Sequence, residues 1–179
     1  DKEIFDNVIN NGGKCILTKK EHKTGTDRIF EALKKLDQSD IEYVINLQGD
    51  EPMINIKDII NLNNYAIYNK SEMATLACKI KNREFFKKKN IVKVITDEKI
   101  SRTKISKAKN FLRYINGDKK NHIYHHIGIY IYKVSTLKKF VNLNQTIKEK
   151  SENLEQLRAI ENNITIDVIY ANSSPIGVD

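Results

Sequence analysis

The apolar residues of this chain recur with two different spacings, and these spacings alternate along the sequence. Repeats of three and four residues predict helices at 2–10, 29–36, 56–66, 135–141 and 152–160. Continuous or alternating apolar runs predict strands at 14–18, 42–49, 73–80, 91–96, 124–132 and 164–171. Because helical and strand patterns alternate, we expect an α/β fold with a mainly parallel, mixed sheet covered by helices.

One stretch follows neither spacing. Residues 98–122 are the least regular part of the chain, and several lysines, among them Lys104, Lys107 and Lys109, make the stretch basic. We expect it to be an irregular, surface-lying segment whose lysines form a solvated face.

Composition and charge narrow the class of protein. A chain of 179 residues fits a single domain with a sizeable core. The net charge of +8 comes from 31 lysines and arginines against 23 acidic residues. A basic balance suits nucleic acid, a membrane surface or a polyanionic small substrate. The lysines are scattered among asparagines and isoleucines, and there is no Trp and no arginine-rich run, so nucleic-acid binding is disfavoured.

Cysteine usage and hydropathy indicate a location. Cys15 and Cys78 are far apart and lack CxxC spacing, so neither a zinc site nor a disulfide framework is expected. No apolar run approaches the roughly 20 residues of a membrane span, and no signal peptide opens the sequence. We therefore expect a cytoplasmic protein with no membrane span.

The predicted strand at 42–49 ends with a Gln-Gly pair and is followed by Asp50, Glu51 and Pro52. Open α/β sheets bind ligands at the carboxyl ends of their strands. Carboxylate oxygens at such a strand end suit Mg²⁺ and a phosphate substrate. The alternative is a solvated acidic turn without a ligand.

A polar loop at 22–28 precedes the helix predicted at 29–36, and Thr24 or Thr26 is a suitable N-cap. The free N–H groups and the dipole of such a helix end attract anions. The alternative is a capped helix that binds nothing.

The predicted strand at 124–132 carries two adjacent histidines, His125 and His126. Neighbouring strand residues point to opposite faces, so the two histidines cannot both ligate one metal. One of them faces either a polar site or a structural partner.

Two sequence blocks carry a resemblance to a known family. Residues 24–28 read TGTDR and residues 46–54 read NLQGDEPMI. They resemble the (S/T)GT(D/E)R and NxQGDEPxI blocks of the 3-deoxy-manno-octulosonate cytidylyltransferases (CMP-Kdo synthetases). Further similar blocks follow in the family's order at 90–94, 101–102, 126–130, 154–158 and 177–179. The resemblance therefore spans nearly the whole chain.

The resemblance implies a Rossmann-like, three-layer nucleotidyltransferase fold with a dimerisation insertion before His125. It implies that residues 1–179 form one such domain, truncated at both ends. The family's N-terminal strand, its basic signature loop and its C-terminal helix have no counterpart in this sequence. We therefore expect the chain as given to be incomplete for activity.

The implied activity is transfer of CMP from CTP to the anomeric hydroxyl of 3-deoxy-D-manno-octulosonate (Kdo). The products are pyrophosphate and CMP-Kdo, which is used in lipopolysaccharide synthesis. The resemblance also implies Mg²⁺ as cofactor and a homodimer, with CTP and Kdo as substrates. Two alternatives stay open: another sugar nucleotidyltransferase, such as an N-acylneuraminate cytidylyltransferase, or a non-catalytic protein that binds anions or nucleic acid.

The matching positions imply roles for individual residues. Asp50 and Asp179 are expected to be the catalytic metal ligands. Substrate-binding residues are expected in both halves of the chain: Thr24, Gly25, Thr26, Arg28, Gln48, Arg102, His126, Tyr130, Glu155 and Gln156. Among these, Arg28 suits the carboxylate of Kdo, because its forked donors can engage both oxygens. A solvated helix face is the alternative for Glu155 and Gln156.

Overall fold

The computed structural model describes residues 1–36, 40–49, 53–115 and 122–172. The two expected metal ligands, Asp50 and Asp179, lie outside these residues. The chain divides into two compact units, Asp1–Ile41 and Glu42–Asp179, and each is described by itself. That residues 1–179 form one domain stays a prediction.

The first unit contains two helices, α1 (Lys2–Asn10) and α2 (Gly25–Leu36). Thr24 caps α2, because its Oγ1 accepts a hydrogen bond from the Asp27 amide at 3.2 Å. The strand predicted at 14–18 is wrong: these residues have no regular secondary structure. A strand needs a hydrogen-bonded neighbour, and the described residues offer this segment none.

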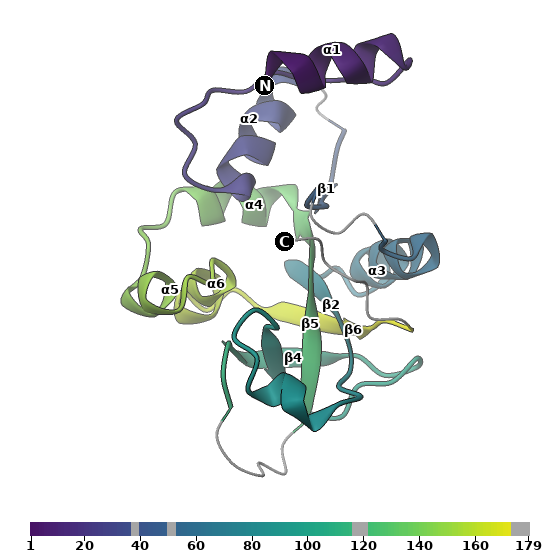
Figure 1. Cartoon of the computed structure of the whole chain (residues 1–179), viewed down its shortest axis with the longest axis vertical. Helices are drawn as coiled ribbons and strands as arrows, with labels where there is room; N and C mark the ends of the chain where they lie inside the picture. Colours follow the sequence, from purple (N-terminus) through teal and green to yellow (C-terminus); the bar gives the residue numbers. More distant parts are fainter. Residues whose placement is uncertain (37–39, 50–52, 116–121, 173–179) are drawn as a thin grey trace. The chain divides into compact units, whose positions relative to one another are not determined.

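The second unit is built on a six-stranded sheet (Figure 1). Its strands are β1 (Tyr43–Asn46), β2 (Met73–Lys79), β3 (Lys93–Thr96), β4 (Ser106–Leu112), β5 (Ile123–Lys133) and β6 (Ile166–Tyr170). Its helices are α3 (Ile56–Tyr68), the 3₁₀ turn η1 (Arg83–Phe86), α4 (Val134–Val141), α5 (Ile147–Glu152) and α6 (Gln156–Glu161). No helix in the described part of the chain is long and apolar enough to cross a membrane.

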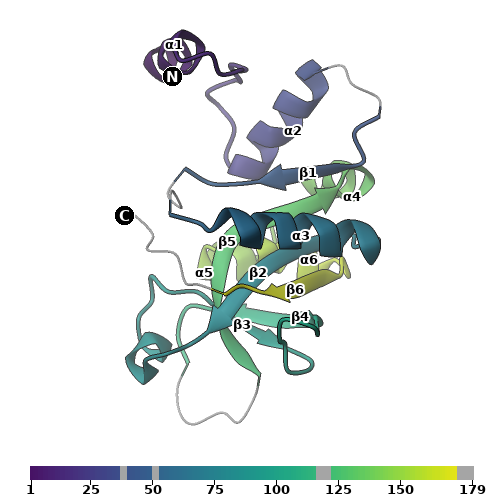
Figure 2. The same ribbon diagram turned by 90° about the vertical axis from the view of Figure 1, so that its right-hand side faces the viewer.

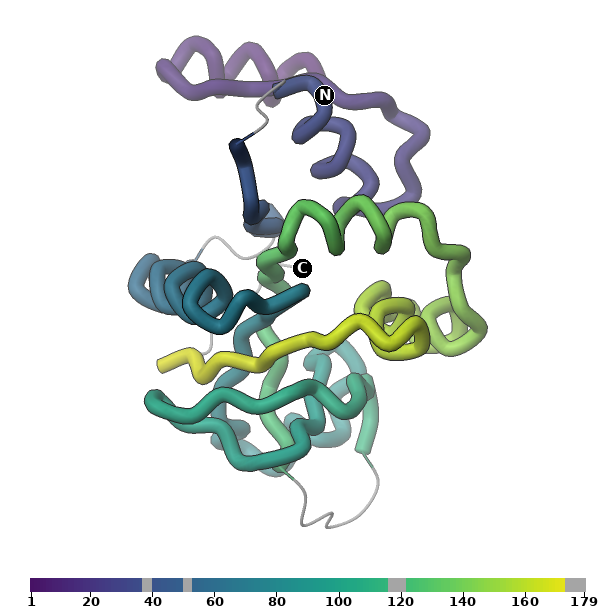
Figure 3. Tube along the Cα trace, turned by 180° about the vertical axis from the view of Figure 1, so that it is seen from behind, coloured from purple at the N-terminus to yellow at the C-terminus, as the bar shows by residue number. Residues whose placement is uncertain are grey.

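The strand order is β1-β5-β2-β6-β4-β3, and β3 also pairs with β5. Figure 3 shows β6 and β4 side by side, as their pairing requires. The prediction of a mainly parallel sheet is wrong for the described strands, since only β2 and β6 run parallel. The long strand β5 runs antiparallel to β1, β2 and β3. The sheet is therefore mixed. The alternation of helices and strands along the chain does not reveal in which direction each strand runs.

Helices pack on both faces of this sheet (Figure 2). On one face, Leu62 and Ala66 of α3 join a buried cluster with Leu76, Ile129 and Ile131. On the other face, the ring of Tyr132 packs against Phe140 of α4, with ring centroids 6.0 Å apart. Successive residues of a strand point to opposite faces, so Ile131 and Tyr132 serve different helices.

Two element predictions need correction. The segment predicted to be irregular contains β4, in which Lys107 and Lys109 are exposed while Ser106 and Phe111 are buried. Exposed and more buried residues thus alternate in β4 with the two-residue period of a strand, which the lysines make hard to recognise in the sequence. The helix predicted at 152–160 begins only at Gln156, as α6, because α5 ends at Glu152 and the chain adopts a left-handed conformation (φ 52°) at Asn153.

Candidate active site

Two expected substrate-binding residues share one face of β5. His126 and Tyr130 are four residues apart, and their ring centroids are 5.3 Å apart. Phe111 of β4 meets the His126 ring edge-on, with centroids 5.1 Å apart. The strand thus brings together the two residues that the family's HIGIY block singles out.

The fully buried Thr75 of β2 lies beside His126. Its Oγ1 lies 3.0 Å from His126 Nε2, 2.7 Å from the Ile129 carbonyl oxygen and 3.3 Å from the Ile127 carbonyl oxygen. The register of β2 against β5 shifts between Thr75 and Leu76, where β5 bulges. The threonine hydroxyl therefore lies where the bulge disturbs the regular pairing of carbonyl groups.

His126 is neutral at physiological pH. Burial lowers the pKa of its imidazole from 6.5 to about 3, and the nearby His125 adds to this effect. Desolvation disfavours the charged form of a base, and no described carboxylate opposes that shift. The ring can therefore offer one donor and one acceptor nitrogen, but no positive charge.

Tyr130 carries the clearest sign of a ligand site. Its hydroxyl oxygen is out of reach of solvent, and no described residue hydrogen-bonds to it. Burial, together with Tyr132 and Glu155, raises the pKa of the Tyr130 phenol well above 10. A buried hydroxyl without a partner is costly, so a partner from outside the described chain is expected.

Glu155 and Gln156 stand at the start of α6. Gln156 is buried, and the Glu155 side chain is only 27% exposed. Both positions therefore depart from the alternative of a solvated helix face. The charge of the Glu155 carboxylate is one of the causes that raise the pKa of Tyr130.

A buried ion pair fixes the start of α6. Arg158 donates to both carboxylate oxygens of Glu149, at 2.9 and 2.5 Å, and stacks on Phe140 at 4.7 Å. Burial works against ionisation of Glu149, but the hydrogen bonds and charge of Arg158 outweigh it and lower the pKa of Glu149. Arg158 Nη2 also lies 3.6 Å from a Glu155 oxygen. The ion pair thus helps to orient Glu155.

The end of β1 reaches the same part of β5. Asn46 is buried and pairs with Tyr130 across the antiparallel ladder. Gln48 donates from Nε2 to the Asn46 Oδ1 at 2.5 Å. Sequence reasoning singled out Gln48 but missed Asn46 and Thr75. In the sequence, the only sign of either residue is that a polar residue stands within, or at the end of, an apolar strand.

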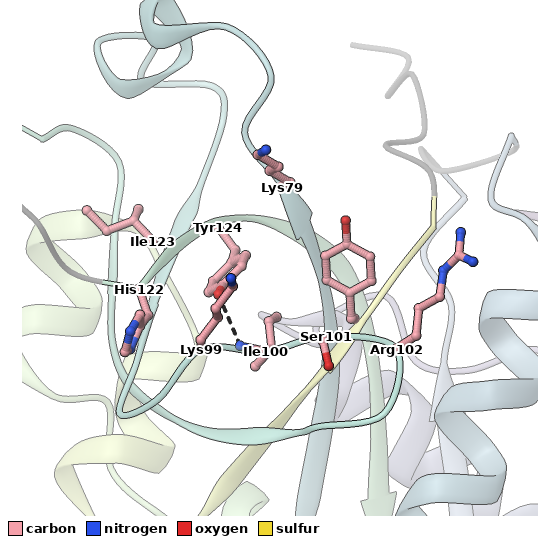
Figure 4. A pocket seen from close by; sticks show the side chains of 9 residues that line it. Lys79, Lys99, Ile100, Ser101, Arg102, His122, Ile123 and Tyr124 are labelled. Atoms are coloured by element: carbon pink, nitrogen blue, oxygen red, sulfur yellow. Dashed lines mark hydrogen bonds between the residues drawn. The ribbon is translucent and has the colours of Figure 1, made fainter.

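Arg102 lies apart from this group. It lines a pocket of about 520 Å³ with three other basic residues, Lys79, Lys99 and His122, and with the aromatic ring of Tyr124. None of the other expected substrate-binding residues lines this pocket. In Figure 4 the Arg102 side chain extends away from Lys99 and His122. In the described residues, Arg102 is therefore not brought together with His126 and Tyr130.

The first unit holds the remaining candidates. Thr24, besides capping α2, donates to the Asp27 carboxylate at 2.9 Å. Thr26 is buried inside α2, next to Gly25 at its start. Arg28 is exposed and donates to Thr18 Oγ1 at 2.7 Å and to the Lys19 carbonyl at 3.1 Å.

The expected metal ligands, Asp50 and Asp179, are residues that the structure does not describe. Among the described residues, no group of three His, Cys, Asp or Glu side chains is arranged to hold a metal ion. One described contact joins the segments that lead to the two aspartates. The buried Asp58, near the start of α3, accepts hydrogen bonds from the amide and side chain of Asn172 at 3.2 and 3.0 Å.

Comparison with known proteins identifies the class. Residues 1–166 match the family model described as cytidylyltransferase. Over its full length the chain is 40% identical to a 3-deoxy-manno-octulosonate cytidylyltransferase of Thermodesulfovibrio yellowstonii, of which it covers 74%. It is 38% identical to the enzyme of that name from Rhizobium etli, of which it covers 71%.

A solved structure agrees. The CMP:2-keto-3-deoxy-manno-octonic acid synthetase complexed with CTP superposes on the whole chain with a TM-score of 0.86 at 31% identity, and the chain covers 72% of it. A 4-diphosphocytidyl-2C-methyl-D-erythritol synthase from Anaerococcus prevotii shares the fold, with a TM-score of 0.58, 16% identity, and 99% of this chain and 68% of that one covered.

The chain therefore belongs to the cytidylyltransferase family. Within that family it belongs with the 3-deoxy-manno-octulosonate cytidylyltransferases.

Proposed function

We propose that this protein is a nucleotidyltransferase that moves CMP from CTP to the anomeric hydroxyl of Kdo. The hydroxyl oxygen forms a bond to the α-phosphorus of CTP, and the bond from that phosphorus to the bridging oxygen breaks. Pyrophosphate leaves, and the hydroxyl proton is lost. The work of the protein in such a step is positioning and charge stabilisation.

The observation that carries the proposal is the buried Tyr130 hydroxyl, which has no partner among the described residues. It lies near Glu155 and on the strand face of His126, in a group that is polar but mostly neutral. A sugar with many hydroxyls can donate to Glu155 and His126 and accept from Tyr130. A nucleic acid backbone would instead call for cations at this position.

The other candidate residues are assigned either to the nucleotide or to the Kdo carboxylate. Gln48, held by Asn46, and the capped N-terminus of α2 at Thr24, Gly25 and Thr26 are proposed to contact cytidine or its phosphates. Arg28 is proposed to engage the Kdo carboxylate with its forked donors. For Arg102 we propose the same role, supported only by the basic character of its pocket.

We propose Mg²⁺ as cofactor, held by Asp50 and Asp179. Two carboxylates together with phosphates and waters form a usual Mg²⁺ site. When bound, the metal neutralises phosphate charge. The bond between Asp58 and Asn172 supports the pairing, since these residues lie eight and seven positions from the two aspartates along the chain.

Acceptor preference is the test of the proposal. Pyrophosphate release from CTP and Mg²⁺ should require Kdo and be far slower with N-acetylneuraminate. Faster release with N-acetylneuraminate would assign the protein to the neighbouring class of sugar nucleotidyltransferases. If CTP with Mg²⁺ gave no thermal shift while an oligonucleotide bound with steep salt dependence, the non-catalytic alternative would replace the proposal.

A cytoplasmic homodimer remains a proposal as well. The family resemblance suggests that the dimerisation insertion lies before His125, in the region that contains β4. Light scattering on the purified protein distinguishes a dimer from a monomer.

A further inference from the structure

We propose that Thr75 is a positioning residue that holds His126 in its Nε2-protonated tautomer and leaves Nδ1 as an acceptor for a sugar hydroxyl. The role of Nδ1 rests on the proposed function. The tautomer itself rests only on the geometry around Thr75.

The threonine hydroxyl carries a single proton. Thr75 Oγ1 lies 2.7 Å from the Ile129 carbonyl oxygen, which can only accept a hydrogen bond. Two oxygens this close repel each other unless a proton lies between them. The Thr75 hydroxyl proton therefore points to Ile129.

With its proton used, Thr75 can only accept from His126. The distance of 3.0 Å from Oγ1 to Nε2 is normal for an N–H···O hydrogen bond. Nε2 must then carry the imidazole proton. In a neutral imidazole the second nitrogen, Nδ1, is an acceptor.

The surroundings of the ring hold this arrangement in place. Thr75 is fully buried and His126 nearly so, and Phe111 and Tyr130 flank the imidazole. In the described chain no group hydrogen-bonds to Nδ1. The neutral state that burial imposes keeps one ring nitrogen as an acceptor.

The chemical class of the group that meets Nδ1 follows. A neutral nitrogen lone pair accepts from a hydroxyl and repels a carboxylate. His126 should therefore select for a hydroxyl of the acceptor sugar, while the sugar carboxylate is met by a cation elsewhere. This excludes His126 as the cationic partner of the carboxylate.

Nitrogen-15 NMR of the protein labelled at histidine tests the tautomer without any substitution. The four histidines are His22, His122, His125 and His126, and loss of one set of signals in His126→Gln assigns the last. We expect neutral His126 with its proton on Nε2, and an NOE from that proton to Thr75. A proton on Nδ1 would overturn the proposal.

Two variants at Thr75 test the cause. Thr75→Ser keeps the hydroxyl and should keep the Nε2 proton. Thr75→Val matches the shape of threonine without the hydroxyl, so the Nδ1-protonated form should become populated. An unchanged tautomer in folded Thr75→Val would contradict the proposal. If Thr75→Val does not fold, the wild-type tautomer, the NOE and Thr75→Ser decide it.

Kinetics separate this proposal from the proposed function. Thr75→Val should raise KM for Kdo roughly ten-fold, the effect of one lost hydrogen bond, with KM for CTP unchanged. Thr75→Ser should restore the wild-type value. If the wild-type protein formed no CMP-Kdo, the proposed function would fail, while the NMR result would still confirm or refute the tautomer.

Discussion

Among single residues, Tyr130 gives the most direct indication of a ligand, through its buried hydroxyl. Tyr130→Phe removes a buried hydroxyl that has no described partner, so the free energy of unfolding should not fall. KM for Kdo should rise roughly ten-fold, because one hydrogen bond to the sugar is lost. Steady-state kinetics and urea unfolding measure the two quantities.

Tyr124→Phe is the matched control for stability. The Tyr124 hydroxyl accepts a hydrogen bond from the Ile100 amide at 3.0 Å inside the fold. Its removal should lower the free energy of unfolding by about 1 kcal/mol, since a buried amide loses its acceptor. If Tyr130→Phe cost as much stability as Tyr124→Phe, the Tyr130 hydroxyl would have an internal role.

His126 gives the protein an acid-sensitive component of stability. Its pKa is about 3 in the folded state, against 6.5 for an ordinary histidine. Between these values the unfolded chain binds a proton that the folded chain does not, so stability is lost as the pH falls from 6.5 toward 3. Urea midpoints measured at several pH values should fall less steeply in His126→Gln than in the wild type.

The exposed His122 is the control for the loss of a histidine, and His122→Gln is measured at the same pH values. A pH dependence identical in His126→Gln and the wild type would show that the buried imidazole contributes nothing to acid sensitivity.

For single residues, the sequence predicted the members of the site better than the residues that contact them. The family blocks singled out His126, Tyr130 and Glu155, which the structure brings together. Thr75 and Asn46 were missed, because a single polar residue in an apolar strand shows no spacing pattern. Their importance appears only when β5 bulges and pairs with β1 and β2.

At the scale of elements, Asp58 links α3 to the chain that follows β6. Asp58→Ala should lower the free energy of unfolding by about 1–3 kcal/mol, because the Asn172 amide and side chain lose their acceptor. It should also weaken Mg²⁺ binding in the presence of CTP, since the segments leading to Asp50 and Asp179 are no longer tied together. Calorimetric titration with Mg²⁺ measures the second effect.

Asn55→Ala provides the comparison at the same helix end. The Asn55 side chain caps α3 by accepting from the Lys57 amide at 2.9 Å, so its loss should cost about 1 kcal/mol. Mg²⁺ affinity should be unchanged, because the bond to Asn172 remains. Equal loss of affinity in both variants would mean that helix stability, and not the link, controls the metal site.

Element predictions succeeded where the apolar residues of the sequence follow one spacing. The helices at α1 and α3 and the long strand β5 follow the apolar pattern closely. The strand β4 was missed because Lys107, Lys109 and Asn110 interrupt its apolar residues. The parallel sheet was predicted wrongly because strand direction depends on tertiary pairing, which periodicity does not encode.

At the scale of the whole molecule, sequence and structure agree on the class. The α/β fold with a mixed sheet, the match to the cytidylyltransferase family, and the grouping of His126, Tyr130 and Glu155 support the same activity. Two of the lysines that contribute to the net charge of +8, Lys79 and Lys99, line the separate pocket that holds Arg102.

Product formation from CTP, Kdo and Mg²⁺, followed by mass spectrometry and a pyrophosphate assay, tests the proposed activity directly. We expect CMP-Kdo and pyrophosphate in equal amounts, with neither formed when Kdo is left out. Release of pyrophosphate without CMP-Kdo, or no consumption of CTP when both substrates and Mg²⁺ are present, would contradict it.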